Sequence, residues 1–311
     1  MNSVSAQVGI DVCKDHLDVS IDGCKPLRVA NSVEGCGELV NRLPAGSVIH
    51  LESTGGFERI PRRLLADAGF LVKVHDPFKV RRMAQARARR GKTDALDAKH
   101  LALAGPDLLA QQEKSPDREK LCDLSRAIDQ LKATAASMRV RAAMPGLDTF
   151  VKASFLEVAT NLSAQVQAME KEFVRRVKQS PLRLKYELAL TVPGVGPCLA
   201  RVAVCELPED LCEFTIPQLT SYAGVAPIDD ESGKSRKPAR IRRGNARLKA
   251  ALYMPALSCI SLQPWAKDLY ARLRARGRAH QQAAIAVMRR LLMRILQVLQ
   301  RGSAWKAEPT P

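Results

Sequence analysis

Two aspartates three residues apart, Asp94 and Asp97, are the side chains in this sequence best placed for chemistry. The surrounding stretch predicts a helix that Thr93 caps and that Gly105-Pro106 ends. On a helix this spacing puts both carboxylates on one face, with Cβ atoms roughly 5–6 Å apart. A basic run precedes them, so a divalent cation acting on a phosphate is one interpretation. The simpler alternative is that both acids only complement the helix dipole.

Two further carboxylates end predicted strands. Asp11 lies near the end of the apolar segment 7–12, and Glu52 closes the segment 48–52. An acid in such an apolar run needs a partner, and a bound cation is one candidate. Ligands of open α/β sheets gather beyond the carboxyl ends of the strands, so we expect all four acids to meet at one edge. Two metals about 3.5–4 Å apart acting on phosphodiesters use such a set, which outweighs the helix-dipole alternative.

The order of elements in the first hundred residues predicts an α/β domain. Apolar or alternating segments indicate strands, and segments with a period near four indicate helices. The expected strands are 7–12, 17–21, 27–29, 48–52 and 71–75, and the expected helices are 33–43, 57–68 and the one with the paired aspartates. His50 and His75 lie at strand ends, as ordinary core or surface residues or as part of a cleft.

Residues 115–180 have a repeating apolar pattern typical of paired helices. Apolar residues recur three and four positions apart from Leu121 to Met138 and again from Phe155 to Phe173, on either side of Pro145-Gly146. This pattern predicts a helical hairpin with a coiled-coil seam. One wall of an internal bundle and a contact between two copies of the chain explain the seam equally well.

A second, mostly helical globular unit is predicted from Tyr186 onward. Val192-Pro193-Gly194-Val195-Gly196 places a Gly-x-Gly turn between two apolar helices. Such a helix-hairpin-helix-like element can offer backbone N–H groups to a phosphate, although any tight turn between helices needs the same glycines. Residues 248–300 have helical spacing, and the tail 305–311 is expected to be disordered.

One serine in this second unit is a candidate nucleophile. Ser232 belongs to a polar, flexible segment that is rich in cations, and nearby positive charge favours the alkoxide that would attack a phosphate. Ser235, three residues further along the same segment, is a competitor for the same role. A serine that is merely solvated in a basic loop is the common alternative.

The overall charge points to a polyanionic partner. The formal net charge is +17 and the isoelectric point is near 9.8, which favours nucleic acid. Aromatic residues make up only 4% of the sequence, so we expect salt-sensitive binding led by the phosphate backbone. The cations expected to contact nucleic acid are Arg87, Arg89, Arg90, Lys92, Lys234, Arg236, Lys237, Arg240, Arg242 and Arg243.

Other features favour a cytoplasmic protein. No apolar run reaches the roughly 18 residues that span a bilayer, no signal peptide is evident, and no membrane partner is expected. The eight cysteines form no CxxC pair, so buried thiols in a reducing compartment are expected instead of a zinc site.

Taken together, these motifs resemble the DEDD transposases of the insertion-sequence-110 type, which are recombinases guided by a bridge RNA. The resemblance covers nearly the whole length, and each piece is short, but their order and spacing are highly specific. It rests on Gly9-Ile10-Asp11-Val12-Cys13-Lys14, Leu51-Glu52-Ser53-Thr54-Gly55, Lys92-Thr93-Asp94-Ala95-Leu96-Asp97-Ala98, Val192-Pro193-Gly194-Val195-Gly196, Ala223-Gly224-Val225-Ala226-Pro227, Glu231-Ser232-Gly233 and Arg243-Gly244-Asn245.

The resemblance implies a domain organisation. Residues 1–110 would be a RuvC-like domain of the ribonuclease-H fold, with Asp11, Glu52, Asp94 and Asp97 binding Mg²⁺ or Mn²⁺. The segment 111–180 would be the coiled-coil hairpin, and 181–304 a mostly α transposase domain in which Ser232 matches the family's nucleophile. The implied partners are donor DNA, target DNA, a guide RNA and further copies of the chain in a dimer or tetramer.

The implied reaction is strand exchange without free ends, in which Ser232 attacks a phosphodiester and holds the strand as a phosphoserine. Neither the serine nor the acids explain this reaction alone, so a composite site is expected. One alternative is a metal-dependent nuclease or junction resolvase without a covalent intermediate. Another is a nucleic-acid-binding protein whose acids hold only a structural ion.

Overall fold

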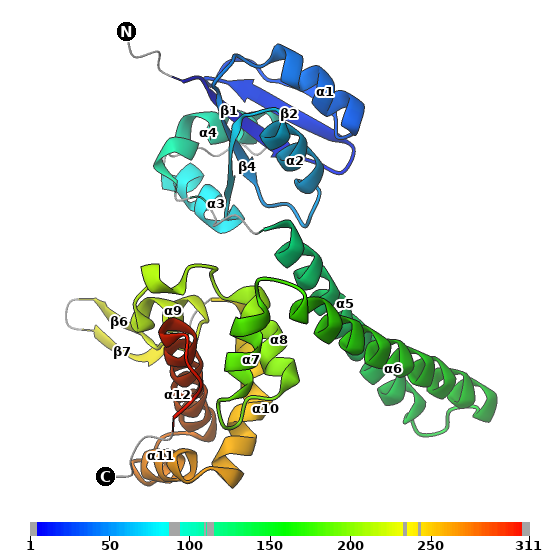
Figure 1. The fold of residues 1–311 in the computed structure, drawn as a ribbon, viewed down its shortest axis with the longest axis vertical. Coiled ribbons are helices and arrows are strands. Elements are labelled where there is room, and N and C mark those ends of the chain that lie inside the picture. Colours follow the sequence, from blue (N-terminus) through cyan, green and yellow to red (C-terminus); the bar gives the residue numbers. More distant parts are fainter. Residues whose placement is uncertain are drawn as a thin grey trace. The chain divides into compact units, whose positions relative to one another are not determined.

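The structure is a computed structural model (Figure 1). It describes most of the chain with side chains and a few short stretches by their backbone alone. The described residues are 5–86, 94–108, 110, 115–232, 235–241 and 244–306, with backbone only for 94–95, 228–232 and 235–240. The chain divides into two compact units, 1–113 and 114–311. The helical segment predicted for 111–180 therefore lies almost entirely in the second unit.

The first unit is built on a mixed five-stranded sheet in the order β3-β2-β1-β4-β5. Strand β2 pairs antiparallel with β1 and β3, whereas β4 pairs parallel with β1 and β5. The predicted α/β pattern is confirmed, and this mixed sheet is compatible with a ribonuclease-H-like domain. The strands are β1 Gln7–Val12, β2 His16–Ile21, β3 Leu27–Ala30, β4 Val48–Glu52 and β5 Leu71–His75.

One face of this sheet is apolar and carries the core of the unit. Ile10 and Leu51 are fully buried in a cluster with Leu39 of α1 (Val33–Arg42) and Leu65 of α2 (Arg59–Asp67). Because side chains alternate along a strand, every second residue of β1 and β4 enters this core. The remaining residues of both strands, Asp11 and Glu52 among them, therefore face the opposite side.

Helix α4 (Asp94–Ala104) covers that opposite side closely. A Cβ atom on Gly9 would lie 2.1 Å from the carbonyl oxygen of Ala98 and 2.2 Å from the amide nitrogen of Ala102. Only glycine therefore allows the helix to approach β1 this closely. The 3₁₀ turn Gly105–Asp107 ends the helix where Gly105-Pro106 predicts, whereas the predicted cap Thr93 lies outside the described residues. Helix α3 is Pro77–Ala86.

The second unit begins with the predicted helical hairpin, which consists of α5 (Pro116–Ala142) and α6 (Thr149–Lys178). Ile128 of α5 and Phe173 of α6 are buried in the seam. The same cluster continues into the rest of the unit, where Phe173 meets Tyr186 with ring centroids 6.0 Å apart. At this end the hairpin forms a wall of the unit's own core, as one of the two interpretations of the seam expects.

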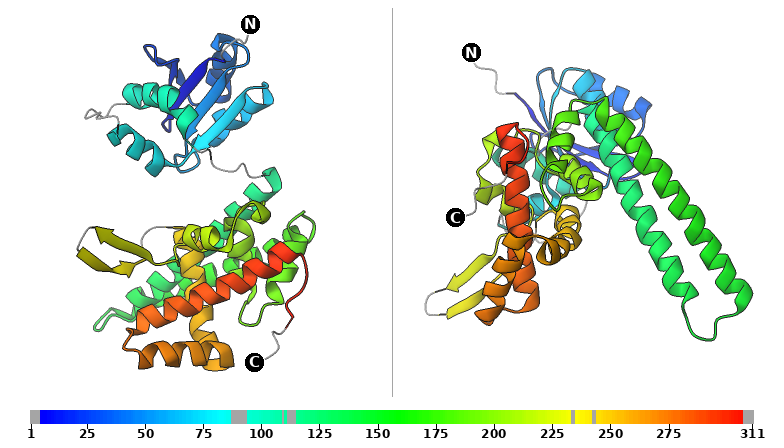
Figure 2. Two further views of the ribbon diagram at one scale, coloured as in Figure 1. Left: turned by 90° about the vertical axis from the view of Figure 1, so that its left-hand side faces the viewer. Right: turned by 60° about the horizontal axis from the view of Figure 1, so that its bottom comes forward.

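Helices α7, α9, α10 and α11 pack against α12 (His280–Arg301), whose inward side chains are largely buried, and α8 packs against α5, α7 and α10 (Figure 2). The predicted Gly-x-Gly turn is a tight interhelical turn, because Gly194 has a φ of +93° and a Cβ there would lie 2.2 Å from Sγ of Cys259. The helices are α7 Arg183–Leu190, α8 Pro197–Glu206, α9 Ile216–Tyr222, α10 Ala246–Leu262, α11 Pro264–Ala275 and α12 His280–Arg301, with a 3₁₀ turn at Leu211–Glu213.

Two sequence-based expectations change at the end of the second unit. The segment predicted to be a flexible loop contains an antiparallel hairpin, β6 (Ile228–Ser232) and β7 (Ser235–Arg240), that projects from the helices (Figure 2). Trp305 falls within the tail expected to be disordered, but it is half-buried, and its ring centroid lies 4.9 Å from the guanidinium carbon of Arg294. Residues 307–311 lie outside the described residues.

None of the helices in the described part of the chain is both long and apolar enough to cross a membrane.

Candidate active site

The structure places Asp11 and Glu52 side by side on neighbouring parallel strands. Ile10 of β1 is paired with Leu51 of β4, and each acid is the next residue along its strand. Residues in register on adjacent strands share a face of the sheet, so both carboxylates belong to the face that α4 covers. Both residues are half-buried. The carboxyl ends of two strands thus bring together two of the four predicted acids.

Helix α4 presents its first turns toward these two acids. Its last turn lies over the start of β1, because the side chain of Leu103 reaches the Gly23 turn, and Asp22 beside it donates its N–H to the carbonyl of Gln7. Farther toward the amino end of the helix, Ala98 lies over Gly9. Asp97 and Asp94 precede Ala98 and so lie toward the carboxyl end of β1. Asp97 is half-buried, and the side chain of Asp94 lies outside the described part.

Carboxylate oxygens are the donors that Mg²⁺ and Mn²⁺ prefer, so the chemistry of Asp11, Glu52 and Asp97 fits such an ion. Among the described side chains, however, no three His, Cys, Asp or Glu residues lie close enough to hold a metal ion. The side chain of Asp94 is not among them. The complete four-acid metal site is therefore a prediction, which the arrangement of β1, β4 and α4 supports.

A third strand adds an acid that the sequence analysis did not single out. Asp18 of β2 is the register partner of Asp11 and lies on the same face. Its two carboxylate oxygens accept hydrogen bonds of 2.9 and 2.8 Å from Nε and Nη2 of Arg28, and the residue is only 4% exposed. Asp18 is therefore neutralised by its own partner. Alternation along 17–21 was its only sequence signal, and that pattern predicted a half-exposed strand.

His50 and His75 are buried beneath α4 and do not line a cleft. Nδ1 of His50 lies 2.9 Å from Nε2 of His75, and Nε2 of His50 lies 2.9 Å from Oε1 of Gln7. Burial, followed by the charges of His75 and Lys73, lowers the pKa of His50 to about 4, so this ring is neutral near pH 7. A Cβ on Gly105 would lie 2.3 Å from the His50 ring, which shows how closely the chain covers it.

Ser232 and Ser235 face each other across the β6–β7 hairpin, next to its turn. The same register pairs Glu231 with Arg236 and Asp230 with Lys237, so opposite charges lie across the two strands. Of the predicted nucleic-acid contacts, Arg236, Lys237 and Arg240 are on β7, where the structure describes only the backbone. Arg87, Arg89, Arg90, Lys92, Lys234, Arg242 and Arg243 lie outside the described residues.

The two ends of this hairpin are fixed against each other by two glycines. Gly244 has a φ of +98°, and a Cβ there would lie 2.3 Å from both the amide nitrogen and the Cα of Gly224. The N–H of Asn245 donates to the carbonyl of Tyr222 at 2.8 Å, and its side-chain amide donates to Glu206 at 2.8 Å. The glycine and asparagine of these motifs therefore hold the base of the hairpin that carries Ser232.

A network of ion pairs continues from Glu206 into the core of the unit. Arg247 pairs with both Glu206 and Asp129, and Arg201 pairs with Asp129 at 2.5 Å. The Arg201 side chain is only 3% exposed, and its guanidinium also donates to the carbonyl of Ser125. A buried cation needs such partners, because an unpaired one would cost several kcal/mol of desolvation. The network joins α5, α8 and α10 beneath the hairpin.

The charge on Asp129 makes the stability of the second unit depend on pH. Burial alone would raise its pKa, but hydrogen bonds and charges from Arg201 and Arg247 outweigh burial and lower the pKa below the ordinary 3.8. A carboxyl whose pKa is lower when folded stabilises the protein above its unfolded pKa and loses that effect as pH falls. We therefore expect Asp129→Asn to lower the free energy of unfolding at pH 7, with the difference from wild type shrinking below about pH 4.

Urea unfolding of both proteins across this pH range measures that difference. Asp123→Asn is the matched control on the same helix, because its ion pair with Arg126 is exposed and 3.8 Å long, so little change is expected. A difference for Asp129→Asn that stays constant down to acid pH would contradict the role of the carboxylate charge.

Two family models match the chain, one over the first unit and helix α5 and the other within the second unit. A model of IS110-type DEDD proteins described as "Transposase" matches residues 8–147, which include Asp11, Glu52, Asp94 and Asp97. A model described as "Transposase IS116/IS110/IS902 family" matches residues 186–271, which include Ser232 and both ends of its hairpin. The motifs quoted from the sequence fall within these two matches.

Several curated proteins are similar to the chain. The pilin gene-inverting protein of Moraxella lacunata is 26% identical over 302 residues, which are 92% of each chain. The insertion element IS110 uncharacterized 43.6 kDa protein of Streptomyces coelicolor is 29% identical over 53% of this chain and 40% of its own length. The mini-circle putative transposase for IS117 from the same organism is 34% identical over 37% of this chain and 28% of its own. The chain thus spans under half of the Streptomyces proteins but nearly all of the Moraxella protein.

Proposed function

The chain belongs to the IS110-type family of DNA transposases, and from this premise we propose that it cuts and rejoins the DNA of an insertion element. The observation that carries the proposal is the adjacency of Asp11 and Glu52 at the carboxyl ends of β1 and β4, with the Asp97 end of α4 directed toward them. The Moraxella relative is named as a gene-inverting protein, and inversion also requires DNA strands to be cut and rejoined.

Asp11, Glu52, Asp94 and Asp97 would hold Mg²⁺ or Mn²⁺, which when bound stabilises negative charge on phosphoryl oxygens. The protein's own contribution is to gather the carboxylates on one polar face. Asp18 is not one of these ligands, because Arg28 donates hydrogen bonds to both of its carboxylate oxygens. The buried pair His50 and His75 supports β4 and β5 from the same face.

Ser232 would supply the nucleophile. Its Oγ loses a proton and forms a bond to phosphorus, while the bond from phosphorus to one bridging oxygen of the DNA breaks and that oxygen leaves as a hydroxyl. The strand is then held as a phosphoserine, and attack by a DNA hydroxyl restores the phosphodiester and the free serine. The position of Ser232 beside the hairpin turn, on a base fixed by Gly224 and Gly244, supports this role.

The proposed partners follow from charge and family. A net charge of +17 favours donor and target DNA, which would contact the cations of β7 and those predicted before α4 and around the hairpin. The family resemblance adds a structured guide RNA and assembly into a dimer or tetramer. A metal-dependent nuclease without a covalent step is the alternative, favoured by the fact that all four acids belong to the first unit.

The experiment that tests the proposal is recombination between a donor and a target plasmid, with the flanking non-coding DNA of the element supplied. The expected result is joined product that depends on Mg²⁺ and disappears when the metal is removed with a chelator. Restoring Mg²⁺ should restore joining, which separates metal removal from irreversible unfolding. Metal-dependent cutting without any joined product would favour the nuclease, and DNA binding without cutting would contradict both reactions.

A further inference from the structure

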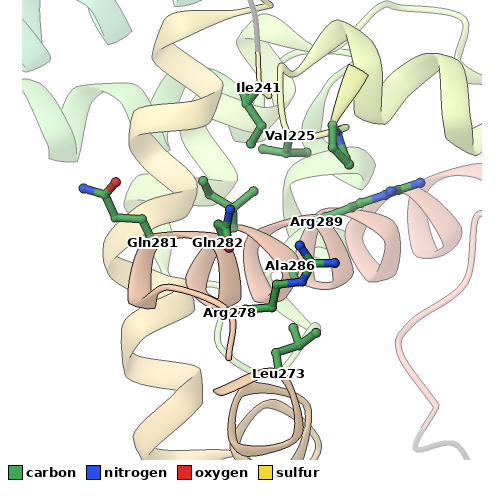
Figure 3. A pocket seen from close by; sticks show the side chains of 10 residues that line it. Val225, Ile241, Leu273, Arg278, Gln281, Gln282, Ala286 and Arg289 are labelled. Atoms are coloured by element: carbon green, nitrogen blue, oxygen red, sulfur yellow. The ribbon is translucent and has the colours of Figure 1, made fainter. Parts of the chain in front are cut away.

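A cavity of about 550 Å³ lies in the second unit where both ends of the β6–β7 hairpin meet α12 (Figure 3). Val225 and Pro227 come just before β6, and Ile241 comes just after β7. Ile285 and Arg289 of α12 line the cavity from the helix. Figure 3 shows Val225 and Ile241 above α12 in that view, Leu273 below it and the Arg278 side chain overlapping the helix. This volume is within the range of pockets that bind small organic ligands.

A second hollow of about 400 Å³ adjoins the first. The two share Val225, Ile241 and Ile285, so a continuous apolar surface runs across the base of the hairpin. The second hollow adds Lys249 and Tyr253 of α10, and the Tyr253 side chain is exposed. An aromatic ring beside a cation and an apolar floor is a surface on which a base can stack.

The rim of the larger cavity is cationic and polar. Arg278 and Arg289 line it, and within the described part of the chain neither guanidinium has an ion pair or hydrogen bond with another side chain. Gln281 lines both hollows, and an amide side chain can pair with the edge of a base. The pocket thus combines an apolar floor, two guanidinium groups available to an anion, and an amide.

This combination matches a nucleotide that has left its base stack. A base buries its faces on apolar side chains and a phosphate pairs with arginine, whereas a whole duplex is far too wide for a cavity of this volume. We propose that the cavity binds one unstacked nucleotide of the DNA strand on which Ser232 acts. Its base lies against the half-buried side chains of Ile241 and Ile285, and its phosphate is held by Arg278 and Arg289.

The cavity lies at the base of the hairpin that carries Ser232, so the bound nucleotide belongs to the DNA strand that Ser232 attacks. This step rests on the proposed function. Ser232 is five residues beyond Pro227, and an extended strand rises about 3.3 Å per residue, so the two are roughly 16 Å apart along the hairpin. Stacked nucleotides rise about 3.4 Å along one strand and unstacked ones rise more, so the bound nucleotide lies only a few steps from the phosphate that Ser232 attacks. A base held there would fix the register of the reacting strand.

The experiment uses the full chain and a mixed-sequence single-stranded DNA that carries 2-aminopurine, whose fluorescence rises when its base unstacks. Arg278→Ala combined with Arg289→Ala should weaken binding about tenfold, because both phosphate contacts are lost. Ala286→Trp should also weaken binding about tenfold and abolish the fluorescence rise, because the indole fills the cavity without changing charge. Each variant is first shown to melt at the wild-type temperature. If Ala286→Trp does not fold, the double arginine variant alone tests the proposal.

Arg272→Ala combined with Arg276→Ala is the matched control, because it removes the same charge from exposed positions that do not line the cavity. Equal losses of affinity in this control and in the cavity variants would overturn the proposal. So would cavity variants that lose affinity for single-stranded RNA of the same sequence but keep affinity for DNA. Ser232→Ala should bind and fluoresce like wild type, so a failure of the serine chemistry remains distinguishable from a failure of the cavity.

Discussion

A Ser232→Ala variant is expected to form no protein–DNA adduct and to lose strand joining by on the order of 10⁴-fold or more, because removing a nucleophile removes the covalent step itself. Denaturing gel electrophoresis of reactions with end-labelled DNA detects the adduct as a protein band that carries label. Binding to DNA should persist, since the hairpin keeps its backbone pairing and only one hydroxyl is lost.

Ser235→Ala is the matched control for this prediction. Ser235 is the register partner of Ser232, so it is a serine at the same level of the hairpin and beside the same turn. We expect Ser235→Ala to form the adduct as wild type does. The opposite pattern would move the nucleophile to Ser235, and normal cutting by both variants would leave the metal-dependent nuclease as the reaction.

An Asp11→Asn variant is expected to lose metal-dependent DNA cutting by on the order of 10³-fold while remaining folded. Asparagine has nearly the same shape but no charge, and the loss of one metal-binding carboxylate removes several kcal/mol of transition-state stabilisation. Cutting of plasmid DNA over a range of Mg²⁺ concentrations measures this effect. A higher Mg²⁺ requirement in the variant would show that the loss lies in metal binding.

Asp18→Asn tests whether position on the sheet face is enough to make an acid catalytic. Asp18 faces Asp11 across β1 and β2, but Arg28 holds both of its oxygens. We expect this variant to keep cutting activity and to lose about 2 kcal/mol of stability, as for buried hydrogen bonds to a charged group. Loss of cutting in Asp18→Asn without loss of stability would mean that Asp18 also belongs to the metal site.

Motifs that resemble a family's signature do not all carry chemistry. Ala223-Gly224 and Gly244-Asn245 meet at the base of the hairpin, where Gly244 leaves room for the backbone of Gly224. Asn245 then ties this base to Glu206 and begins α10 by accepting the N–H of Leu248. Their role is to hold the segment that presents Ser232, and the motif Val192 to Gly196 similarly forms a turn packed on Cys259.

The sequence by itself determined the features that depend on neighbouring residues. Alternation and helical spacing predicted the strands of the first unit and the hairpin α5–α6, and the apolar segments ending in Asp11 and Glu52 predicted two acids at strand ends. Gly105-Pro106 predicted where α4 ends. These signals are local because a residue's strand or helix periodicity is set by residues only a few positions away.

Only the tertiary structure decided which residues meet across long separations. The register of β1 with β2 and β4 gave Asp11 two acidic neighbours, and the bidentate contact of Arg28 showed that Asp18 is already paired. The polar segment around Ser232 forms an antiparallel hairpin whose register places residues of opposite charge at paired positions, and local polarity does not reveal that pairing. The cavity likewise exists only where Val225, Ile241 and Ile285 meet, because packing brings together residues that are distant in the sequence.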